Sequence, residues 1–281
     1  MSHSLEDVRD ERGEVVYVDL LGGGMVEVGA RLPHLAAAAR PGQFAQLRCG
    51  SGVDPLLRRP FSVAWTHGEV TAFVLAPVGV GTRILASLRP GDSVTALGPL
   101  GAGFTTETPA RRALCVSGGL GCAPFPLLIR ALRNRGTAVT VISGAANAER
   151  LYPAERFVRG DDAVTVMELT DDGSRGRRGV VTAAVADHLD DATAVYGCGP
   201  NPMLDALART VGAGATRPLL AEVSLEAPMG CGFGTCLGCA LPVHGVNGER
   251  AWALCCTAGP VMPMASVAWE ELMKLPPAHV A

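Results

Sequence analysis

Short runs of strand-forming residues, some of them partly alternating between apolar and polar positions, lie between residue 13 and about residue 98 of the chain. Three of these runs, at residues 14–18, 44–48 and 69–75, are rich in β-branched and aromatic residues. Pro-Gly or His-Gly pairs stand between such runs and mark turns. Closely spaced strands separated by turn signals predict an antiparallel β-barrel, to which we assign residues 1–108.

A different pattern follows the glycine-rich loop expected at residues 98–103. Apolar strands now alternate with helical segments. Strands are expected at 113–117, 138–143, 163–167 and 192–196, and helices at 124–135, 181–189 and 202–211. This βαβ alternation predicts a doubly wound parallel sheet over residues 109–220. The remaining residues, 221–281, are dominated by Gly and Cys and are expected to form a small domain that folds around metal.

Composition and charge narrow the class of protein. The 281 residues exceed one usual hydrophobic core, and 48% apolar with 18% charged residues indicates a globular chain. A formal net charge of −3 lacks the basic excess of a nucleic-acid binder. Because no apolar stretch reaches about 18 residues and the first residues lack the pattern of a signal peptide, we expect a cytoplasmic protein without membrane spans.

Five of the nine cysteines crowd into the C-terminal region. Cys231, Cys236 and Cys239 have the spacing C-x4-C-x2-C, and a fourth ligand would be Cys255 or Cys256. This is the plant-type [2Fe–2S] pattern, and the intervening glycines let the thiolates converge and expose N–H groups to the sulfurs. A structural zinc site is the alternative, although zinc ribbons use paired C-x2-C knuckles and only one is present.

Two glycine turns indicate a nucleotide site. Gly118-Gly-Leu-Gly121 follows a strand and precedes a helix opened by Pro124, where free N–H groups favour a pyrophosphate. A second turn, residues 196–200, stands in the same strand-to-helix position, so both turns should lie at the carboxyl edge of one sheet. Neither has the G-x-G-x-x-G spacing, so the pair carries the prediction rather than either turn alone.

The barrel contains candidates for a second phosphate-bearing ligand. Residues 58–62 (Arg-Arg-Pro-Phe-Ser) and 79–82 (Gly-Val-Gly-Thr) offer guanidinium groups, hydroxyls and backbone that a ligand can approach. An Arg fork suits phosphate because it donates two parallel hydrogen bonds. The alternative for Arg58 and Arg59 is that both are surface charges.

Taken in order, these motifs resemble the ferredoxin–NADP reductase superfamily and, within it, the family of dihydroorotate dehydrogenase B electron-transfer subunits. Further segments typical of that family are Thr170–Ser174, Gly179–Thr182, Ser224–Glu226 and the frame Cys256-Thr-Ala-Gly-Pro-Val261. The resemblance covers nearly the whole chain.

The resemblance implies three sets of binding residues. FAD would be bound by Arg59, Pro60, Phe61, Ser62, Gly79, Gly81 and Thr82. The nicotinamide nucleotide would be bound by Gly118, Gly119, Gly121, Cys198, Gly199 and Pro200. The family frame selects Cys256 over Cys255, so the cluster ligands would be Cys231, Cys236, Cys239 and Cys256.

The chain also departs from the family pattern. Phe61 stands where many relatives have Tyr, and Ala76-Pro-Val precedes Gly79 where a basic residue is common. The tract 143–150 has one basic residue for a ribose 2′-phosphate, which favours NAD over NADP.

The function implied by the resemblance is electron transfer in pyrimidine (UMP) biosynthesis. An FMN-containing catalytic subunit would oxidise dihydroorotate, and electrons would pass through the [2Fe–2S] cluster and FAD to NAD⁺, within a heterotetramer. No catalytic acid or base of this chain is expected. The alternatives are a related NAD(P)H–ferredoxin or hydrogenase-type reductase subunit and a non-catalytic, zinc-stabilised interaction protein.

Overall fold

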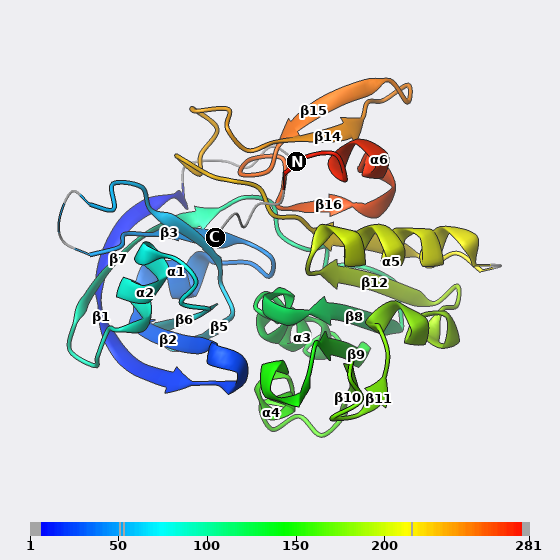
Figure 1. Cartoon of the computed structure of the whole chain (residues 1–281), viewed down its shortest axis with the longest axis horizontal. Coiled ribbons are helices and arrows are strands. Elements are labelled where there is room, and N and C mark those ends of the chain that lie inside the picture. The colour runs from blue at the N-terminus through cyan, green and yellow to red at the C-terminus, as the bar shows by residue number, and fades with distance from the viewer. Residues whose placement is uncertain (1–6, 51, 53, 215, 277–281) are drawn as a thin grey trace.

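Two seven-stranded sheets lie side by side, and a cysteine-containing segment packs against both (Figure 1). The computed structural model describes residues 7–50, 52, 54–214 and 216–276. Residues 1–6, which carry the expectation about a signal peptide, lie outside the described residues.

The first sheet is the antiparallel barrel predicted from the alternating pattern. Its strands run in the order β4-β3-β7-β1-β2-β6-β5. Their bounds are β1 (Arg9–Leu20), β2 (Val26–Arg31), β3 (Phe44–Leu47), β4 (Arg59–Ser62), β5 (Trp65–His67), β6 (Val70–Leu75) and β7 (Ser93–Leu100), with short helices α1 (Pro33–Ala38) and α2 (Val80–Ala86). Alternate side chains such as Val15, Val28, Leu47 and Phe73 fill one buried core, as period-two patterning requires.

One expectation for the barrel was wrong. Residues 98–100, expected in a loop, form the end of β7, where Gly98 pairs with β1 and Leu100 pairs with Phe44 of β3. Gly98 and Pro99 are turn-forming residues, but they extend the strand here because β7 has a partner strand on each side, β1 and β3.

The second sheet is mainly parallel, as predicted, with the order β11-β10-β9-β8-β12-β13-β16. Its strands are β8 (Arg112–Gly118), β9 (Ala138–Ala145), β10 (Val164–Thr170), β11 (Arg177–Arg178), β12 (Thr193–Cys198), β13 (Leu220–Ser224) and the antiparallel β16 (Val261–Pro263). Helices α3 (Phe125–Arg133), α4 (Ala154–Val158) and α5 (Asn201–Ala213) flank it. The helix expected at 181–189 is instead two 3₁₀ turns, Val181–Ala184 and Ala186–His188, in a stretch with β-branched residues that favour helix weakly.

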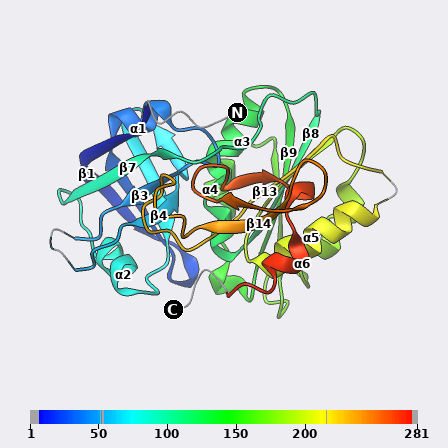
Figure 2. The same cartoon turned by 90° about the horizontal axis from the view of Figure 1, so that it is seen from above.

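The C-terminal segment packs onto both sheets. It contains the hairpin β14 (Ala240–His244) and β15 (Arg250–Leu254), then β16 and the short helix α6 (Trp269–Leu272). Strand β16 pairs with β13, and Phe44 of the barrel shares a buried cluster with Cys239 and Cys256. Figure 2 shows the segment lying across β3 and β4 on one side and across β13 on the other. The boundaries 108/109 and 220/221 stay predictions, and β13 lies across the second of them.

Candidate functional site

The two glycine turns meet at the carboxyl edge of the parallel sheet. Strands β8 and β12 are paired so that Ser117 stands opposite Cys198, and each strand leads into its turn. A Cβ on Gly121 would overlap the backbone of Cys198 and Gly199, which shows how closely the turns approach. The sequence placed both turns at one edge, and the structure brings them into direct contact.

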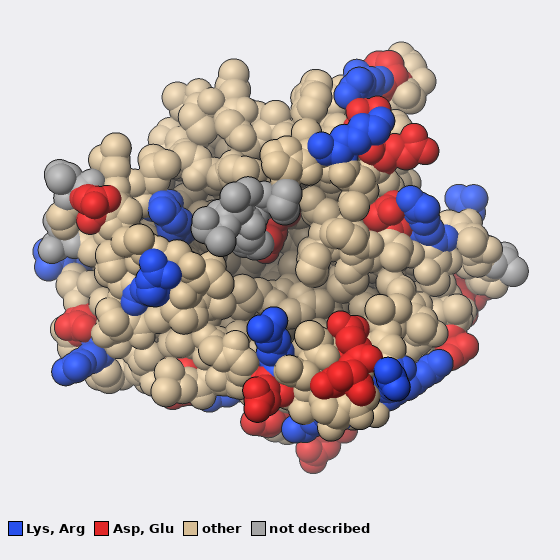
Figure 3. Space-filling view, in the orientation of Figure 1, with Lys and Arg blue, Asp and Glu red and all other residues tan. Residues whose placement is uncertain are grey.

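A cavity of about 470 Å³ opens beside these turns. It is lined by Gly118, Gly119, Leu120, Gly121, Gly199, Pro200, Asn201, Pro202, Glu226, Leu272, Met273 and Leu275. Figure 3 shows that the surface is hollowed between the barrel and the parallel sheet. Free backbone N–H groups and a carboxyl-edge location are the features by which open α/β sheets bind nucleotides.

Cys198 is almost completely buried beside this cavity. Burial, and then the negative charge of Glu226, raises the pKa of its thiol well above the ordinary value. The sulfur therefore stays protonated at neutral pH, and a protonated thiol is a poor nucleophile. The environment agrees with a binding role for this residue.

The cysteine loop, residues 231–239, lies beside Cys256, and the four predicted ligands contact one another in two pairs. The Cys236 N–H donates to Cys231 Sγ over 3.4 Å, and the Sγ atoms of Cys239 and Cys256 lie 3.2 Å apart. A [2Fe–2S] cluster takes four thiolates, two for each iron, so the pairing fits this group. Within the described ranges, no three His, Cys, Asp or Glu side chains converge as they would on a single metal ion.

The polarity of the loop also suits metal-bound thiolates. Burial alone would raise the pKa of Cys231, but the N–H groups of Cys236, Phe233 and Thr235 outweigh burial and lower the pKa to about 6. For Cys256, burial, and then the Cys239 sulfur, raises the pKa to about 12. A bound metal cation would oppose this rise in pKa, because metal binding deprotonates the ligand thiol.

Cys255 and Cys256 face different neighbours although they are adjacent. Cys255 is fully buried, and its sulfur donates to the Leu225 carbonyl over 3.4 Å. Cys256 is the residue whose sulfur reaches Cys239. The side chains thus diverge, one toward β13 and one toward the other thiols.

The two barrel motifs assigned to FAD come together in space. A Cβ on Gly81 would lie 2.9 Å from Cys49 Sγ and 3.4 Å from Arg59 Nε. The missing side chain of Gly81 therefore leaves space beside the Arg59 side chain. The Thr82 hydroxyl closes the turn by bonding Gly79 N and O, at 2.9 and 3.0 Å. The absence of a side chain at Gly81 and the adjacent guanidinium fit a phosphate-bearing ligand.

The two neighbouring arginines of this motif differ. Arg58 forms two 2.7 Å bonds to the Asp10 carboxylate, which agrees with its interpretation as a surface charge. Arg59 Nη1 donates to the carbonyl oxygens of Leu57 and Arg58, at 2.9 and 3.2 Å. Arg59 is the better suited of the two to an anionic ligand, because its charge is not already matched by Asp10.

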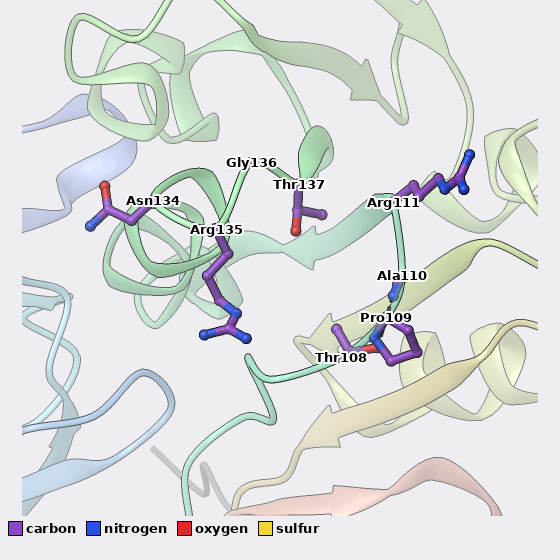
Figure 4. Close-up of a pocket in the computed structure, with 8 residues that line it drawn as sticks. All are labelled: Thr108, Pro109, Ala110, Arg111, Asn134, Arg135, Gly136 and Thr137. Atoms are coloured by element: carbon purple, nitrogen blue, oxygen red, sulfur yellow. Dashed lines mark hydrogen bonds between the residues drawn. The ribbon is translucent and has the colours of Figure 1, made fainter.

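A second pocket, of about 720 Å³, lies at the opposite edge of the parallel sheet (Figure 4). It opens where β8 and β9 begin, and Arg111 and Arg135 point away from each other there. Ligands of open α/β sheets bind at the carboxyl edge instead. We therefore place the functional site at the cavity beside the glycine turns.

Some residues of the site could not be found from sequence patterns. Glu226 was noticed only as part of a family segment, and Leu272, Met273 and Leu275 belong to a C-terminal stretch without any binding motif. They reach the cavity beside the glycine turns because β16 and α6 return to the sheet after the cysteine loop.

Two family models match the chain. The model of the iron–sulfur cluster binding domain of dihydroorotate dehydrogenase B matches residues 226–268, and that of the oxidoreductase NAD-binding domain matches residues 115–209. The fold and these sites define an oxidoreductase subunit that transfers electrons between an iron–sulfur centre and a nicotinamide nucleotide. The zinc-stabilised alternative is therefore not supported.

Curated relatives identify the family more closely. The electron transfer subunit of dihydroorotate dehydrogenase B (NAD(+)) from Desulforamulus reducens is 40% identical over 245 residues, 85% of this chain and 90% of the relative. The subunit of the same description from Bacillus caldolyticus is 40% identical over 228 residues, 79% of this chain and 84% of the relative. The chain belongs to the family of dihydroorotate dehydrogenase B electron transfer subunits.

Solved structures agree on the fold. An NADH-dependent reduced ferredoxin-NADP oxidoreductase structure matches with a TM-score of 0.80 and 27% identity, covering 93% of this chain and 91% of that chain. A ferredoxin NADP+ reductase from Neisseria gonorrhoeae matches with a TM-score of 0.62 at 16% identity, over 73% of this chain and 92% of that one. In the part of the chain that the structure describes, no helix is both long and apolar enough to cross a bilayer.

Proposed function

We propose that this chain takes electrons from an FMN-containing dihydroorotate dehydrogenase catalytic subunit and delivers them to NAD⁺ in pyrimidine (UMP) biosynthesis. The observation that carries the proposal is the packing of the paired thiols against the barrel sheet, with Cys239, Cys256 and Phe44 in one buried cluster. When bound, FAD exchanges single electrons with an iron–sulfur cluster and a hydride with a nicotinamide. The protein supplies positions and local polarity for these groups.

Three sets of residues would hold the cofactors. The cluster would be held by Cys231, Cys236, Cys239 and Cys256. The FAD would be held by Arg59, Pro60, Phe61, Ser62, Gly79, Gly81 and Thr82. The nicotinamide nucleotide would be held by Gly118, Gly119, Gly121, Cys198, Gly199 and Pro200. The divergent side chains of Cys255 and Cys256 support Cys256 as the fourth ligand.

Contacts between the sheets support a fixed path between these sites. Strand β3 lies beside β4, which carries the proposed FAD residues, and β3 also packs against the cysteine loop. Just beyond β4, the Ala64 carbonyl accepts a 2.9 Å bond from Leu127 N–H of α3, the helix that follows the first glycine turn. The three sites are therefore connected by short, hydrogen-bonded segments.

The proposed partner would dock where the cysteine loop reaches the surface. Cys236 is exposed there, and Phe233 and Leu237 are 39% and 64% exposed beside it. Exposed apolar side chains next to an electron-transfer centre suit a close protein contact. We propose a heterotetramer with the catalytic subunit, located in the cytoplasm.

Analysis of the anaerobically purified chain tests the cofactor assignment. We expect one FAD, two irons and two sulfides per chain. Cys256→Ser should abolish the visible absorption of the cluster while FAD remains, because a ligand thiolate is lost. Cys255→Ser is the matched control and should retain the cluster. Zinc in place of iron, or cluster loss in the Cys255 variant alone, would contradict the assignment.

A related reductase subunit that uses ferredoxin stays a second candidate. The match to the reduced ferredoxin-NADP oxidoreductase structure extends over 93% of this chain. The two candidate functions differ in the electron donor, which is dihydroorotate through a catalytic subunit in the first and reduced ferredoxin in the second. We expect orotate and NADH to form when the chain is mixed with a purified FMN catalytic subunit, dihydroorotate and NAD⁺. NADH formation with reduced ferredoxin, and none with dihydroorotate, would favour the second candidate.

A further inference from the structure

Gln46 is a buried polar side chain without a hydrogen-bond partner. It lies on β3, paired with Pro60 of β4 and Leu97 of β7, and is 0% exposed. Among the described residues, neither its Nε2 nor its Oε1 atom is hydrogen-bonded. Buried amides are almost always bonded, so this position suits a ligand or cofactor that supplies the missing partner.

The amide of Gln46 faces the cysteine loop. Its neighbours Ala45 and Leu47 belong to the barrel core, so alternation along the strand turns Gln46 to the opposite face. A Cβ on Gly232, the residue after Cys231, would lie 2.8 Å from Gln46 Nε2. Figure 2 shows the loop crossing over β3. Gly232 has φ of 85° and lacks the side chain that would otherwise displace the amide.

The chemistry of the loop defines what this amide would meet. An amide Nε2 carries two N–H donors, and thiolate and sulfide sulfurs are acceptors that carry the negative charge of a cluster. Donors that face cluster sulfurs stabilise the reduced, more negative state and so raise the reduction potential.

We propose that Gln46 is a positioning residue for the iron–sulfur cluster, whose Nε2 donates a hydrogen bond to a sulfur of the cluster or of its ligands and raises its reduction potential. The proposal rests on the proposed function. It adds a barrel residue to the environment of the cluster and links cluster potential to β3, the strand beside the FAD residues of β4.

A redox titration followed by electron paramagnetic resonance tests the proposal on the full, cofactor-loaded chain. Gln46→Met keeps the length of the side chain and removes the donor. At a fixed potential, we expect the ratio of reduced to oxidised cluster to fall about tenfold, which is a decrease of about 59 mV for one electron. Thr71→Val is the matched control, because Thr71 Oγ1 is also buried and unpartnered but lies on β6 of the same sheet. Its midpoint should equal that of the wild type.

A second measurement does not depend on the folding of a variant. The chain has only two glutamines, Gln43 and Gln46, and Gln43 Nε2 already donates to the Gly101 carbonyl over 2.8 Å. With ¹⁵N in the side-chain amides of glutamine, pulsed resonance of the reduced wild type should detect coupling from one nitrogen to the cluster spin. Gln43→Met should keep this coupling.

Three results would contradict the role proposed for Gln46. Absence of the coupling in the labelled wild type, or a Gln46→Met midpoint equal to that of the wild type, overturns the proposal. A shift confined to the flavin absorbance, with the cluster midpoint unmoved, also overturns it. Wild-type protein without iron and sulfide would instead reject the proposed function, so the two failures are distinct.

Discussion

Gly121 lies where the two glycine turns touch, and the contact depends on its missing side chain. A Cβ there would overlap the Cys198 carbonyl, which belongs to rigid backbone. We expect Gly121→Ala to separate the turns and to weaken NADH binding at least tenfold. The dissociation constant of NADH, from flavin or nucleotide fluorescence, measures this.

A glycine of the same sheet domain provides the control. Gly212 lies near the end of α5, and an added Cβ would meet no atom within 4 Å. Gly212→Ala should leave NADH affinity unchanged and stabilise the fold by about 0.5–1 kcal/mol, because alanine loses less backbone entropy in a helix. Equal NADH affinities in the two variants would show that the turns need not touch.

Individual residues were predictable where their chemistry is local in sequence. The spacing of Cys231, Cys236 and Cys239 identifies a cluster pattern without any tertiary information. The surroundings of Gln46 and Glu226 were not predictable, because each acquires its neighbours from segments far away in the chain. Cysteine spacing alone left the fourth ligand open between Cys255 and Cys256, and the family frame selects Cys256. The structure adds that the two side chains diverge, Cys255 toward Leu225 and Cys256 toward Cys239.

Elements were predicted best where the hydrophobic period is regular. The buried strands of the parallel sheet appear as expected, because strands covered on both faces are nearly continuous apolar runs. The prediction of a helix at 181–189 was wrong. Two short 3₁₀ turns stand there, and they already bury apolar residues such as Val181 and Ala184. No local signal predicts that β16 completes the edge of the parallel sheet, because that pairing depends on the course of the whole cysteine segment.

A buried ion network joins β2 of the barrel to α4 of the parallel-sheet domain. Glu27 is 0% exposed and accepts bonds from Tyr17 Oη at 2.8 Å, Arg156 Nη1 at 3.1 Å and Arg159 Nη2 at 3.0 Å. Burial, and then the charge of Glu27, raises the pKa of Tyr17, which keeps its hydroxyl a donor. The network therefore fixes the orientation of the two sheets.

Removing the central charge of this network should be costly. We expect Glu27→Gln to lower the free energy of unfolding by about 3 kcal/mol, because two arginines lose a buried counter-charge. Glu69→Gln is the control, since Glu69 pairs with Arg31 on the surface, where both side chains are about 60% exposed. That change should cost less than about 1 kcal/mol. Urea denaturation measures both, and equal losses would mean that the buried network adds no particular stability.

At the scale of the whole molecule, the order of the domains and the shared edge of the two glycine turns were predictable. The packing of the cysteine segment against both sheets was not, because it depends on the three-dimensional courses of β3 and β13. This packing leaves one side of the cysteine loop at the surface. On the face shown in Figure 3, the surface above β3 carries mostly uncharged side chains.

Leu237 is the exposed apolar residue that best reports on docking of a partner at this surface. It is 64% exposed and has φ of 59°, a left-handed conformation that costs an L-residue about 1–2 kcal/mol. Aspartate tolerates this conformation more readily, so Leu237→Asp should not destabilise the loop. We expect it to keep FAD and the cluster and to weaken association with the proposed FMN-containing partner at least tenfold, because a charge would be buried in the contact.

Titration of the catalytic subunit in an analytical ultracentrifuge measures this association. Leu20→Asp provides the control, since Leu20 is 83% exposed at the end of β1 and remote in sequence from the cysteine loop. It should assemble as the wild type does. If Leu237→Asp also assembles normally, the partner contacts another face, and electrons would have to enter through a different part of the surface. Loss of the cluster in Leu237→Asp would instead show that the leucine stabilises the loop itself.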